Sequence, residues 1–291
     1  MSHPIRNDFR LLHRLRVRWA EVDLQKIVFN PHYLMYIDTA FTEYWRALAI
    51  PYEVIPELLG GDLYVKKSVL EYHASAHLDD LLEVGVKCAR IGNSSMIFSS
   101  GIFRADTLLV TGELVYVFAD PATQRSKAVP PDLRMLLDSY EAGVSPIDVQ
   151  LGTWAELGPE AAALRREVFV DELKIPIDIQ QDAHDLDAVH VLVRNRLGQP
   201  LATARLMQDG PAVARVARVA VRRAMRASGL GRTLMNALML VAAERGDTRM
   251  ILQSQSSAEG FYARLGFVPI GEPTIEGGVR HIDMARKLNA L

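Results

Sequence analysis

The sequence predicts two parts: an α+β part, in which an antiparallel sheet wraps one long helix, and then a mixed α/β part. The first prediction rests on residues 31–49, where apolar side chains recur every three or four positions, and on the strand-like runs that follow them. The second rests on alternating helix-like and strand-like segments in the second half. Between them, residues 138–150 lose the pattern and contain Gly, Ser and Pro, so we expect domains at 1–140 and 141–291 with a seam near residue 145.

The composition indicates a globular protein without a nucleic-acid or membrane partner. The chain has 291 residues, 23% of them charged, and a net charge of −2, so no strong field would attract nucleic acid or an anionic membrane. No apolar run approaches the roughly 20 residues that span a bilayer, and the first residues do not form an apolar leader. Cys88 is the single cysteine, which fits a reducing compartment, and we expect a cytoplasmic protein. With no Cys/His cluster at ligand spacing, we expect no metal.

The first part is expected to open with a short strand that contains Val17 and Trp19. Asn30 is a suitable N-cap for the helix at 31–49, and Pro31 suits its first position. The predicted apolar stripe of this helix consists of Tyr33, Leu34, Ile37, Phe41, Tyr44, Trp45 and Leu48. Strands rich in Val, Ile, Phe and Tyr are predicted at 63–73, 81–91, 95–105 and 108–119.

The second part alternates between helices and strands. Helices are expected near 159–173, 229–245 and 257–265. Strands are expected at 188–194, 200–207, 213–221 and 249–254, with a final strand pair at the end.

The loop that leads into helix 229–245 has the composition of an anion site. A β-branched strand ends, and Arg226-x-x-Gly229-x-Gly231 then opens the helix. The glycines let a ligand approach the backbone, and the free N–H groups of a helix start favour a diphosphate. Arg223, Arg226 and Arg232 would add positive charge. The alternative is an ordinary turn with solvated arginines, because short glycine patterns have many false matches.

Four segments resemble the GCN5-related N-acetyltransferase (GNAT) family, in the order that this family has them. The family's R-x-x-G-x-G/A loop matches RASGLG at 226–231, and its F-Y-x-x-L-G-F turn matches FYARLGF at 261–267. One branch of the family also has an opening helix like LRREVFVDELKIP at 164–176 and a closing segment like TIEGGVRHIDM at 274–284. The resemblance covers residues 147–288 and implies a GNAT fold that uses acetyl-CoA.

The GNAT resemblance implies roles for particular residues. The backbone of Val219, Ala220 and Val221 would pair with pantetheine, and Arg226, Ala227, Ser228, Gly229, Leu230, Gly231 and Arg232 would hold the diphosphate. Tyr262 would protonate the departing thiolate, for which a phenol is suited by its pKa of about 10. The general base stays open among His281, Asp185, Glu259 and a water. His281 has the best intrinsic pKa for this work.

The first part resembles the hotdog-fold acyl-CoA thioesterases of the 4-hydroxybenzoyl-CoA type. The shared pattern is an aromatic, two acids separated by one residue, an I-V-aromatic run and a helix start, as in RWAEVDLQKIVFNPHY at 18–33. HLDDLLEVGVKCARIGNSSMIF at 77–98 matches a later strand and turn, and the resemblance covers residues 10–137. It implies that Asp23 attacks the thioester or activates a water. N–H groups at His32 and Tyr33 would polarise the carbonyl, because helix starts leave N–H groups free.

The chain also departs from that thioesterase pattern. Gln25-Lys26 stands where relatives often have Gly-Gly, and Asn30 where many have His. His32 is a candidate to replace that histidine, and Glu71 is a weaker acid/base candidate. Ser94 and Ser95 are expected to shape a turn near bound CoA. Hotdog domains of this type pair through their sheets, so a homodimer or homotetramer is implied.

Two CoA-directed modules in one chain suggest linked acyl chemistry. The preferred hypothesis is a thioesterase fused to an N-acyltransferase, with acyl-CoA and acetyl-CoA as substrates and no permanently bound cofactor. The alternative is that one module has lost catalysis and binds acyl-CoA to regulate or scaffold the other. The amine acceptor and the acyl chain length are left open.

Overall fold

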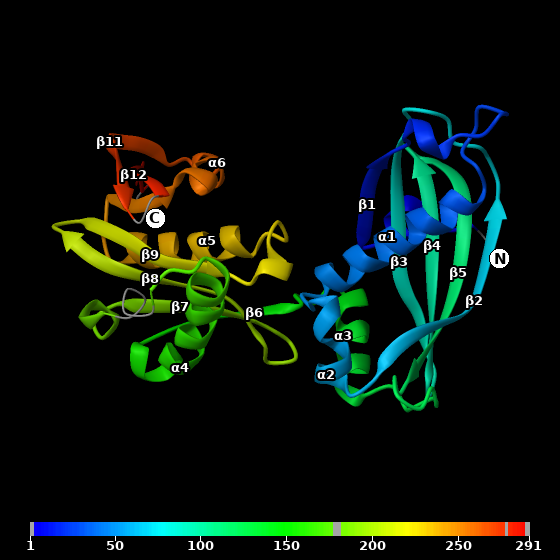
Figure 1. Cartoon of the computed structure of the whole chain (residues 1–291), viewed down its shortest axis with the longest axis horizontal. Coiled ribbons are helices and arrows are strands. Elements are labelled where there is room, and N and C mark those ends of the chain that lie inside the picture. The colour runs from blue at the N-terminus through cyan, green and yellow to red at the C-terminus, as the bar shows by residue number, and fades with distance from the viewer. Residues whose placement is uncertain (1–2, 177–181, 277–278, 289–291) are drawn as a thin grey trace. The chain divides into compact units, whose positions relative to one another are not determined.

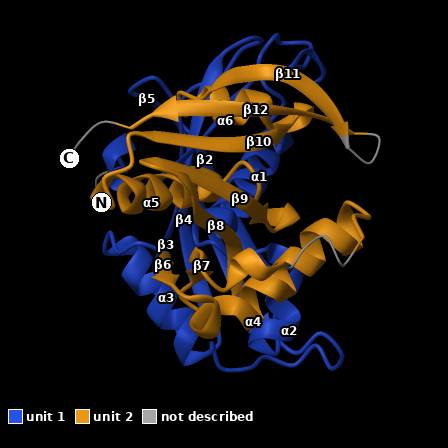
Figure 2. Ribbon diagram, turned by 90° about the vertical axis from the view of Figure 1, so that its left-hand side faces the viewer, with its two compact units in different colours: residues 1–146 blue, residues 147–291 orange. Residues whose placement is uncertain are grey.

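The chain forms two compact units, Met1–Pro146 and Ile147–Leu291 (Figure 2). The computed structural model describes residues 3–176, 182–276 and 279–288. The predicted architecture of both halves is confirmed: an antiparallel sheet with a long helix comes first, and a mixed α/β sheet follows.

Unit 1 is a five-stranded antiparallel sheet in the order β1-β3-β4-β5-β2. Its strands are β1 (Leu11–Arg16), β2 (Asp62–Tyr72), β3 (Leu81–Ile91), β4 (Ser95–Arg104) and β5 (Thr107–Ala119). Helix α1 (Pro31–Ala47) lies along this sheet, as Figure 1 shows. Its buried side chains are Tyr33, Tyr36, Ile37, Ala40, Phe41, Tyr44 and Trp45. Leu34, which we placed in the buried stripe, is 36% exposed instead.

The opening strand differs from the prediction, because it ends at Arg16 and excludes Val17 and Trp19. The carboxylate of Glu21 accepts a hydrogen bond from the Arg18 N–H at 2.7 Å. This contact closes a 3-10 turn at Trp19–Glu21, and Trp19 is 81% exposed. The hydrogen bonds of one nearby acid, Glu21, therefore end the strand. The apolar character of Val17 and Trp19 did not indicate this end.

Two elements on either side of the seam near residue 145 were not predicted from the sequence. Helix α3 (Pro131–Glu141) buries Leu133, Leu136, Leu137 and Tyr140, and β6 (Ile147–Gly152) is the edge strand of unit 2. A short helix, α2 (Ile55–Leu59), follows α1. The leucine spacing after Pro131 is the signal that could have revealed α3.

Unit 2 is a seven-stranded sheet in the order β11-β12-β10-β9-β8-β7-β6. Its remaining strands are β7 (Val189–Asn195), β8 (Pro200–Gly210), β9 (Val213–Val221), β10 (Arg249–Gln255), β11 (Val268–Glu276) and β12 (Val279–Lys287). Only the β9–β10 pairing is parallel among the described residues. The helices are α4 (Trp154–Arg165), α5 (Leu230–Glu244) and α6 (Glu259–Ala263).

Helix α4 begins earlier than the predicted residue 159. Thr153 and Glu156 form a capping box, so Pro159 lies inside the helix. The chain continues beyond α4 as a π-helical segment, Arg166–Glu172. Across the described residues, no helix has both the length and the apolar character needed to cross a membrane.

Candidate functional sites

Asp23 occupies a tight turn immediately before α1. Its backbone N–H donates to the Ile27 carbonyl at 2.9 Å, and the Lys26 N–H donates to the Asp23 carbonyl at 2.9 Å. Isolated bridges between Val22 and Val28 and between Ile27 and His77 fix the turn. The side chain is half-buried, and its Oδ1 accepts the Gln25 N–H at 2.8 Å. Its Oδ2 has no hydrogen bond within the described ranges, so one carboxylate oxygen is available to a ligand.

Glu21, two residues before Asp23, holds this turn in place, and we assigned it no such role from the sequence. It is 3% exposed, and the Tyr36 hydroxyl of α1 donates to its Oε2 at 2.7 Å. Burial alone would raise the pKa of Glu21, but hydrogen bonds from the Arg18 backbone, the Arg18 side chain and Tyr36 bring this pKa below its usual value. Glu21 is therefore a fixed carboxylate that ties the turn to the first part of α1.

The start of α1 does not expose the two N–H groups that the sequence suggested. The His32 N–H donates to the Phe29 carbonyl at 2.9 Å, and the Tyr33 N–H donates to the Asn30 carbonyl at 3.3 Å. Asn30 itself has helical backbone angles and makes no side-chain cap. The expectation of free groups at His32 and Tyr33 is therefore wrong, because a tight first turn supplies acceptors that an ordinary helix start lacks. The Asn30 N–H has no acceptor among the described residues.

In unit 2, the two parallel strands separate at their carboxyl ends. Strand β9 pairs with β10 only from Val213 to Val216, opposite Arg249 to Leu252. Both strands then continue, to Val221 and Gln255, without pairing with each other. An opening between the carboxyl ends of neighbouring strands is a common ligand site in α/β sheets. Val219, Ala220 and Val221 form the β9 side of this opening.

The loop between β9 and α5 has the backbone shape of an anion site. Ala227 and Gly229 have φ values of 64° and 92°, so left-handed residues alternate with others before the helix starts. Such alternation gathers backbone N–H groups into a concavity. The hydroxyl of Ser228 donates to the Met225 carbonyl at 2.5 Å and braces the loop.

Arg226 is already paired, whereas the sequence suggested that its charge faces a ligand. Its two terminal nitrogens contact the carboxylate oxygens of Glu172 at 2.7 Å each. Arg222 makes a similar contact with Glu167 at 3.0 Å. Both acids come from the π-helical segment Arg166–Glu172, so that segment supplies the acidic partners of the arginines next to the loop.

Tyr262 and His281 lie near the carboxyl end of β10, the strand that forms one side of this opening. Tyr262, on α6, is 7% exposed; burial raises its pKa to about 12, and its hydroxyl has no hydrogen bond among the described residues. His281, on β12, is in register with Gln255 at the end of β10. Its Nδ1 lies 2.9 Å from the Val279 carbonyl, so Nδ1 donates to that carbonyl and Nε2 is the ring nitrogen left for another partner.

Comparison with known proteins agrees with both resemblances. Residues 157–288 match a family model described as an acetyltransferase (GNAT) domain, and residues 25–111 match the thioesterase superfamily. The uncharacterized N-acetyltransferase YjcF of Bacillus subtilis is 30% identical over 129 residues, which are 44% of this chain and 90% of that protein. The chain belongs to the GNAT acetyltransferase family.

Its N-terminal unit is a thioesterase-superfamily domain. The acyl-CoA thioester hydrolase YbgC of Escherichia coli O157:H7 is 28% identical over 120 residues, which are 41% of this chain and 89% of that protein. Among solved structures, ElaA of Escherichia coli is 30% identical to this chain. The match covers 48% of this chain and 99% of the ElaA chain, with a TM-score of 0.44. The predicted fusion of a hotdog thioesterase domain with a GNAT domain is confirmed.

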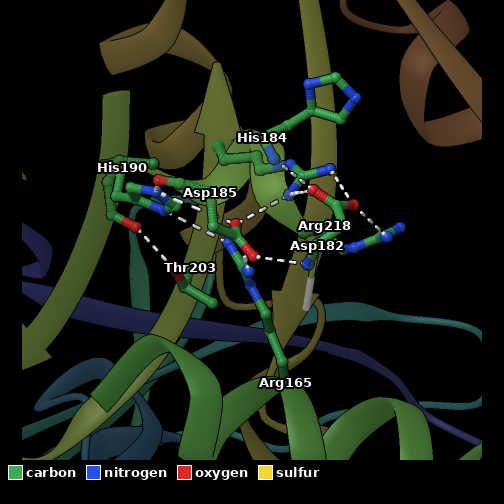
Figure 3. Close-up of polar contacts among 9 residues, drawn as sticks. Arg165, Asp182, His184, Asp185, His190, Thr203 and Arg218 are labelled. Carbon is green, nitrogen blue, oxygen red and sulfur yellow. Dashed lines mark hydrogen bonds and ion pairs between the residues drawn. The ribbon is translucent and has the colours of Figure 1, made fainter. Parts of the chain in front are cut away.

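The GNAT domain contains a buried ion cluster that sequence reasoning missed (Figure 3). Arg165, Asp185 and Arg205 are each at most 3% exposed, and Asp185 Oδ1 lies 2.8 Å from a nitrogen of each arginine. Burial would raise the pKa of Asp185, but these hydrogen bonds bring it below its usual value. Asp185 is therefore poorly suited to be the general base that we considered, because its carboxylate is buried, is bound by two arginines and has a lowered pKa, which makes it a weak proton acceptor.

His190 completes the cluster as a neutral ring. Its Nε2 lies 2.8 Å from the Asp185 carbonyl, and its Nδ1 lies 3.3 Å from a nitrogen of Arg165. Burial lowers the pKa of His190, in agreement with a ring that donates from Nε2 and accepts at Nδ1. Each buried charge in this network thus has a partner of opposite charge.

A basic hollow of about 670 Å³ lies on the GNAT domain beside the first two turns of α5. Its cations are Arg232, Arg264, Arg286 and Lys287. Arg232 follows the anion loop directly, and Phe261 of α6 packs against Gly231. Leu265 and Val268 add apolar surface to the lining. The hollow therefore combines positive charge with an apolar wall next to the anion loop.

In the thioesterase domain, residues that we had assigned to one bound substrate lie far apart within the chain. Ser94 and Ser95 shape the β3–β4 turn, where the carbonyls of Ser94 and Ser95 accept hydrogen bonds from Phe118 and Gly92. The Asp23 turn lies at the other end of β3, whose length at about 3.3 Å per residue is roughly 30 Å. Glu71 is exposed on the edge strand β2, and His32 has a buried Nδ1 with no partner among the described residues. No group of metal-ligating side chains occurs within the described residues.

Proposed function

We propose that the chain is a bifunctional CoA-dependent enzyme. In this proposal the thioesterase domain hydrolyses acyl-CoA thioesters, and the GNAT domain transfers an acyl group from acetyl-CoA to an amine. The observation that carries the proposal is the opening between the carboxyl ends of β9 and β10, after which the chain continues into the anion loop and into α6 with Tyr262. A thioester extended along β9 would bring its diphosphate to the α5 start and its sulfur toward α6.

Hydrolysis would use Asp23 and the start of α1. The available Oδ2 of Asp23 either attacks the thioester carbon, so that the C–S bond breaks and water then hydrolyses the acyl anhydride, or removes a proton from a water that attacks this carbon and displaces the CoA thiolate. The Asn30 N–H is the backbone donor that lacks an acceptor among the described residues, and it would stabilise the oxyanion in place of His32 and Tyr33. The buried, unpartnered Nδ1 of His32 offers a further contact for substrate.

Acyl transfer would use the groups around the opening in the GNAT sheet. Val219 and Val221 pair with the pantetheine amides, and the loop from Arg226 to Gly231 holds the diphosphate. Tyr262 is protonated at neutral pH, as a proton donor to the thiolate requires, and burial, which raises its pKa to about 12, favours this neutral form further. His281 Nε2 serves as the base that removes a proton from the amine. The basic hollow receives the adenosine end of CoA.

Thiol release from acyl-CoA separates the two activities. We expect release without an amine that is abolished by Asp23→Asn, and additional release that requires an amine and falls with Tyr262→Phe. Each variant is the control for the other, because the two residues belong to different compact units. Binding of acyl-CoA without turnover in one unit would instead make that unit a regulatory or scaffolding module.

The thioesterase domain is also proposed to form a homodimer or homotetramer through its sheet. Strand β2 is an edge of the sheet and carries exposed Val65, Val69 and Tyr72. An exposed apolar edge favours pairing with another strand. Light scattering should give a mass of at least twice the 32.4 kDa of one chain, and a monomer would reject this part of the proposal.

A further inference from the structure

Strand β9 contains a bulge immediately after it leaves β10. Thr203 and Arg205 of β8, two residues apart, face Ala220 and Ala217 of β9, which are three residues apart. The extra residue lies at Arg218 or Val219, and Arg218 has a φ of 54°. Bulges bend a strand and increase its twist. The bend therefore begins where the pairing of β9 with β10 ends, at Val216.

Arg218 is an unfavourable residue for this backbone shape. A left-handed conformation costs a residue with a β-carbon more than it costs glycine, so the bulge needs support from elsewhere. That support comes from a partly exposed ion pair at the edge of the buried cluster, in which Arg218 Nη2 lies 3.0 Å from Asp182 Oδ2. Figure 3 shows the Arg218 side chain beside the Asp182 carboxylate.

The same carboxylate holds the strand across from the bulge. Asp182 Oδ1 and Oδ2 each lie 2.7 Å from a terminal nitrogen of Arg205. Arg205 is paired with Ala217, the residue directly before Arg218. Asp182 is in turn fixed by the His184 N–H, which donates to Oδ1 at 3.0 Å. One carboxylate thus joins β8, at Arg205, to β9, at Arg218 in the bulge.

We infer that Asp182 and Arg218 form a clamp that holds the β9 bulge and so keeps β9 away from β10 where the thioester enters. Arg218 is a positioning residue here: it acts through the backbone of Val219 and not by touching the substrate. The inference rests on the proposed acyl transfer, since the opening matters only if a CoA conjugate occupies it.

Substitutions at residue 218 distinguish the effect of losing the Arg218 ion pair from the effect of the backbone conformation at this residue. Arg218→Ala keeps the β-carbon and loses the clamp, so the bulge should relax. Arg218→Gly also loses the clamp but favours the left-handed conformation, so the bulge should persist. Asp182→Asn should resemble Arg218→Ala, and adding Arg218→Gly to Asp182→Asn should restore the bulge. Ala212→Gly is the matched control, because Ala212 has a φ of 56° in the β8–β9 turn, outside the bulge.

The first measurement follows the backbone and needs no activity. NMR contacts between Thr203 and Ala220, with the carbon shifts of Val219, report the β8–β9 register in the full chain. We expect altered signals in Arg218→Ala and Asp182→Asn and wild-type signals in Arg218→Gly and Ala212→Gly. An unchanged register in Arg218→Ala and Asp182→Asn would overturn the inference, whatever the enzyme does.

The second measurement is kcat/KM for acetyl-CoA in amine acylation. Arg218→Ala should lose about fivefold to thirtyfold, the factor that corresponds to the cost of a left-handed residue, and Arg218→Gly should stay near the wild-type value. Equal losses in both variants would overturn the clamp, because the side chain itself would then be needed. A wild-type chain that neither binds nor uses acetyl-CoA would reject the proposed function while leaving the register result intact.

Discussion

The two candidate sites differ in what holds them in shape. The Asp23 turn is fixed by backbone hydrogen bonds and by Glu21, which is tied to a tyrosine of α1. The anion loop of the GNAT domain and the β9 bulge are fixed by ion pairs, with Glu172 on Arg226 and Asp182 on Arg218. A hydrogen-bonded turn is ready before substrate arrives, whereas a phosphate must compete with a carboxylate for its arginine. The first site should therefore respond less to charge changes than the second.

The largest expected effect is on stability. Asp185→Asn removes a carboxylate from two buried arginines, and we expect it to lower the free energy of unfolding of the GNAT domain by about 3–5 kcal/mol. Glu21→Gln removes hydrogen bonds of a buried carboxylate in the thioesterase domain and should cost about 1–3 kcal/mol. Calorimetry on the full chain, with one transition assigned to each domain, measures both. Equal costs would mean that the two sites are not held differently.

Acid should act on the clamp in a defined pH range. Hydrogen bonds from Arg205 bring the pKa of Asp182 to about 2, below its ordinary value of about 3.9. A lowered folded-state pKa gives stability that is present above the unfolded pKa and is lost as pH falls through the folded one. The melting temperature of the GNAT domain should therefore fall between pH 4 and pH 2.

Asp182→Asn sharpens this pH prediction. The variant should melt lower at neutral pH and lose less between pH 4 and pH 2 than the wild type does. The thioesterase domain supplies the internal reference: hydrogen bonds from Arg6 bring the pKa of Glu83 to about 2, so its transition should shift over the same range in both proteins. An unchanged acid response of the GNAT domain in Asp182→Asn would contradict the assignment.

Removing the competing carboxylate should strengthen CoA binding. Glu172→Gln frees Arg226 from a partly exposed pair, and such pairs contribute up to about 1 kcal/mol, so we expect about fivefold tighter binding by calorimetry. Glu160→Gln is the control, because Glu160 pairs with Arg194 on β7, on an element that does not carry the anion loop. Weaker binding in Glu172→Gln would show that the carboxylate orients Arg226 and does not compete with phosphate.

The sequence predicted the helix starts beside both candidate sites, because each helix start has a local signal. The Asn-Pro pair before α1 and the glycines before α5 set the helix starts, and both helices begin within one residue of the prediction. Partners distant in the sequence were not predictable. Glu172 is 54 positions from Arg226 in the chain, and Asp182 is 36 positions from Arg218. The N–H groups of His32 and Tyr33 were misjudged because a tight first turn is a property of the backbone, which residue types leave open.

The smallest expected effect concerns the Asp23 turn itself. Lys26 has a φ of 62° and an exposed side chain. Lys26→Gly removes the cost of a left-handed β-carbon and adds some entropy to the unfolded chain, so a net stabilisation of about 0.5–1 kcal/mol is expected for the thioesterase domain.

The neighbouring Gln25→Gly is the control. Gln25 does not have a positive φ, so this substitution only increases the conformational entropy of the unfolded chain and should destabilise the domain. The two variants should shift the melting temperature of the first domain in opposite directions, with that of the GNAT domain unchanged. Since the turn is already fixed by the Asp23 and Ile27 backbone, Lys26→Gly should leave thioester hydrolysis at the wild-type rate. A faster or slower rate would mean that the turn moves during the reaction. The contrast between a first site that is formed before substrate binds and a second site whose arginine is paired with a carboxylate would then be wrong.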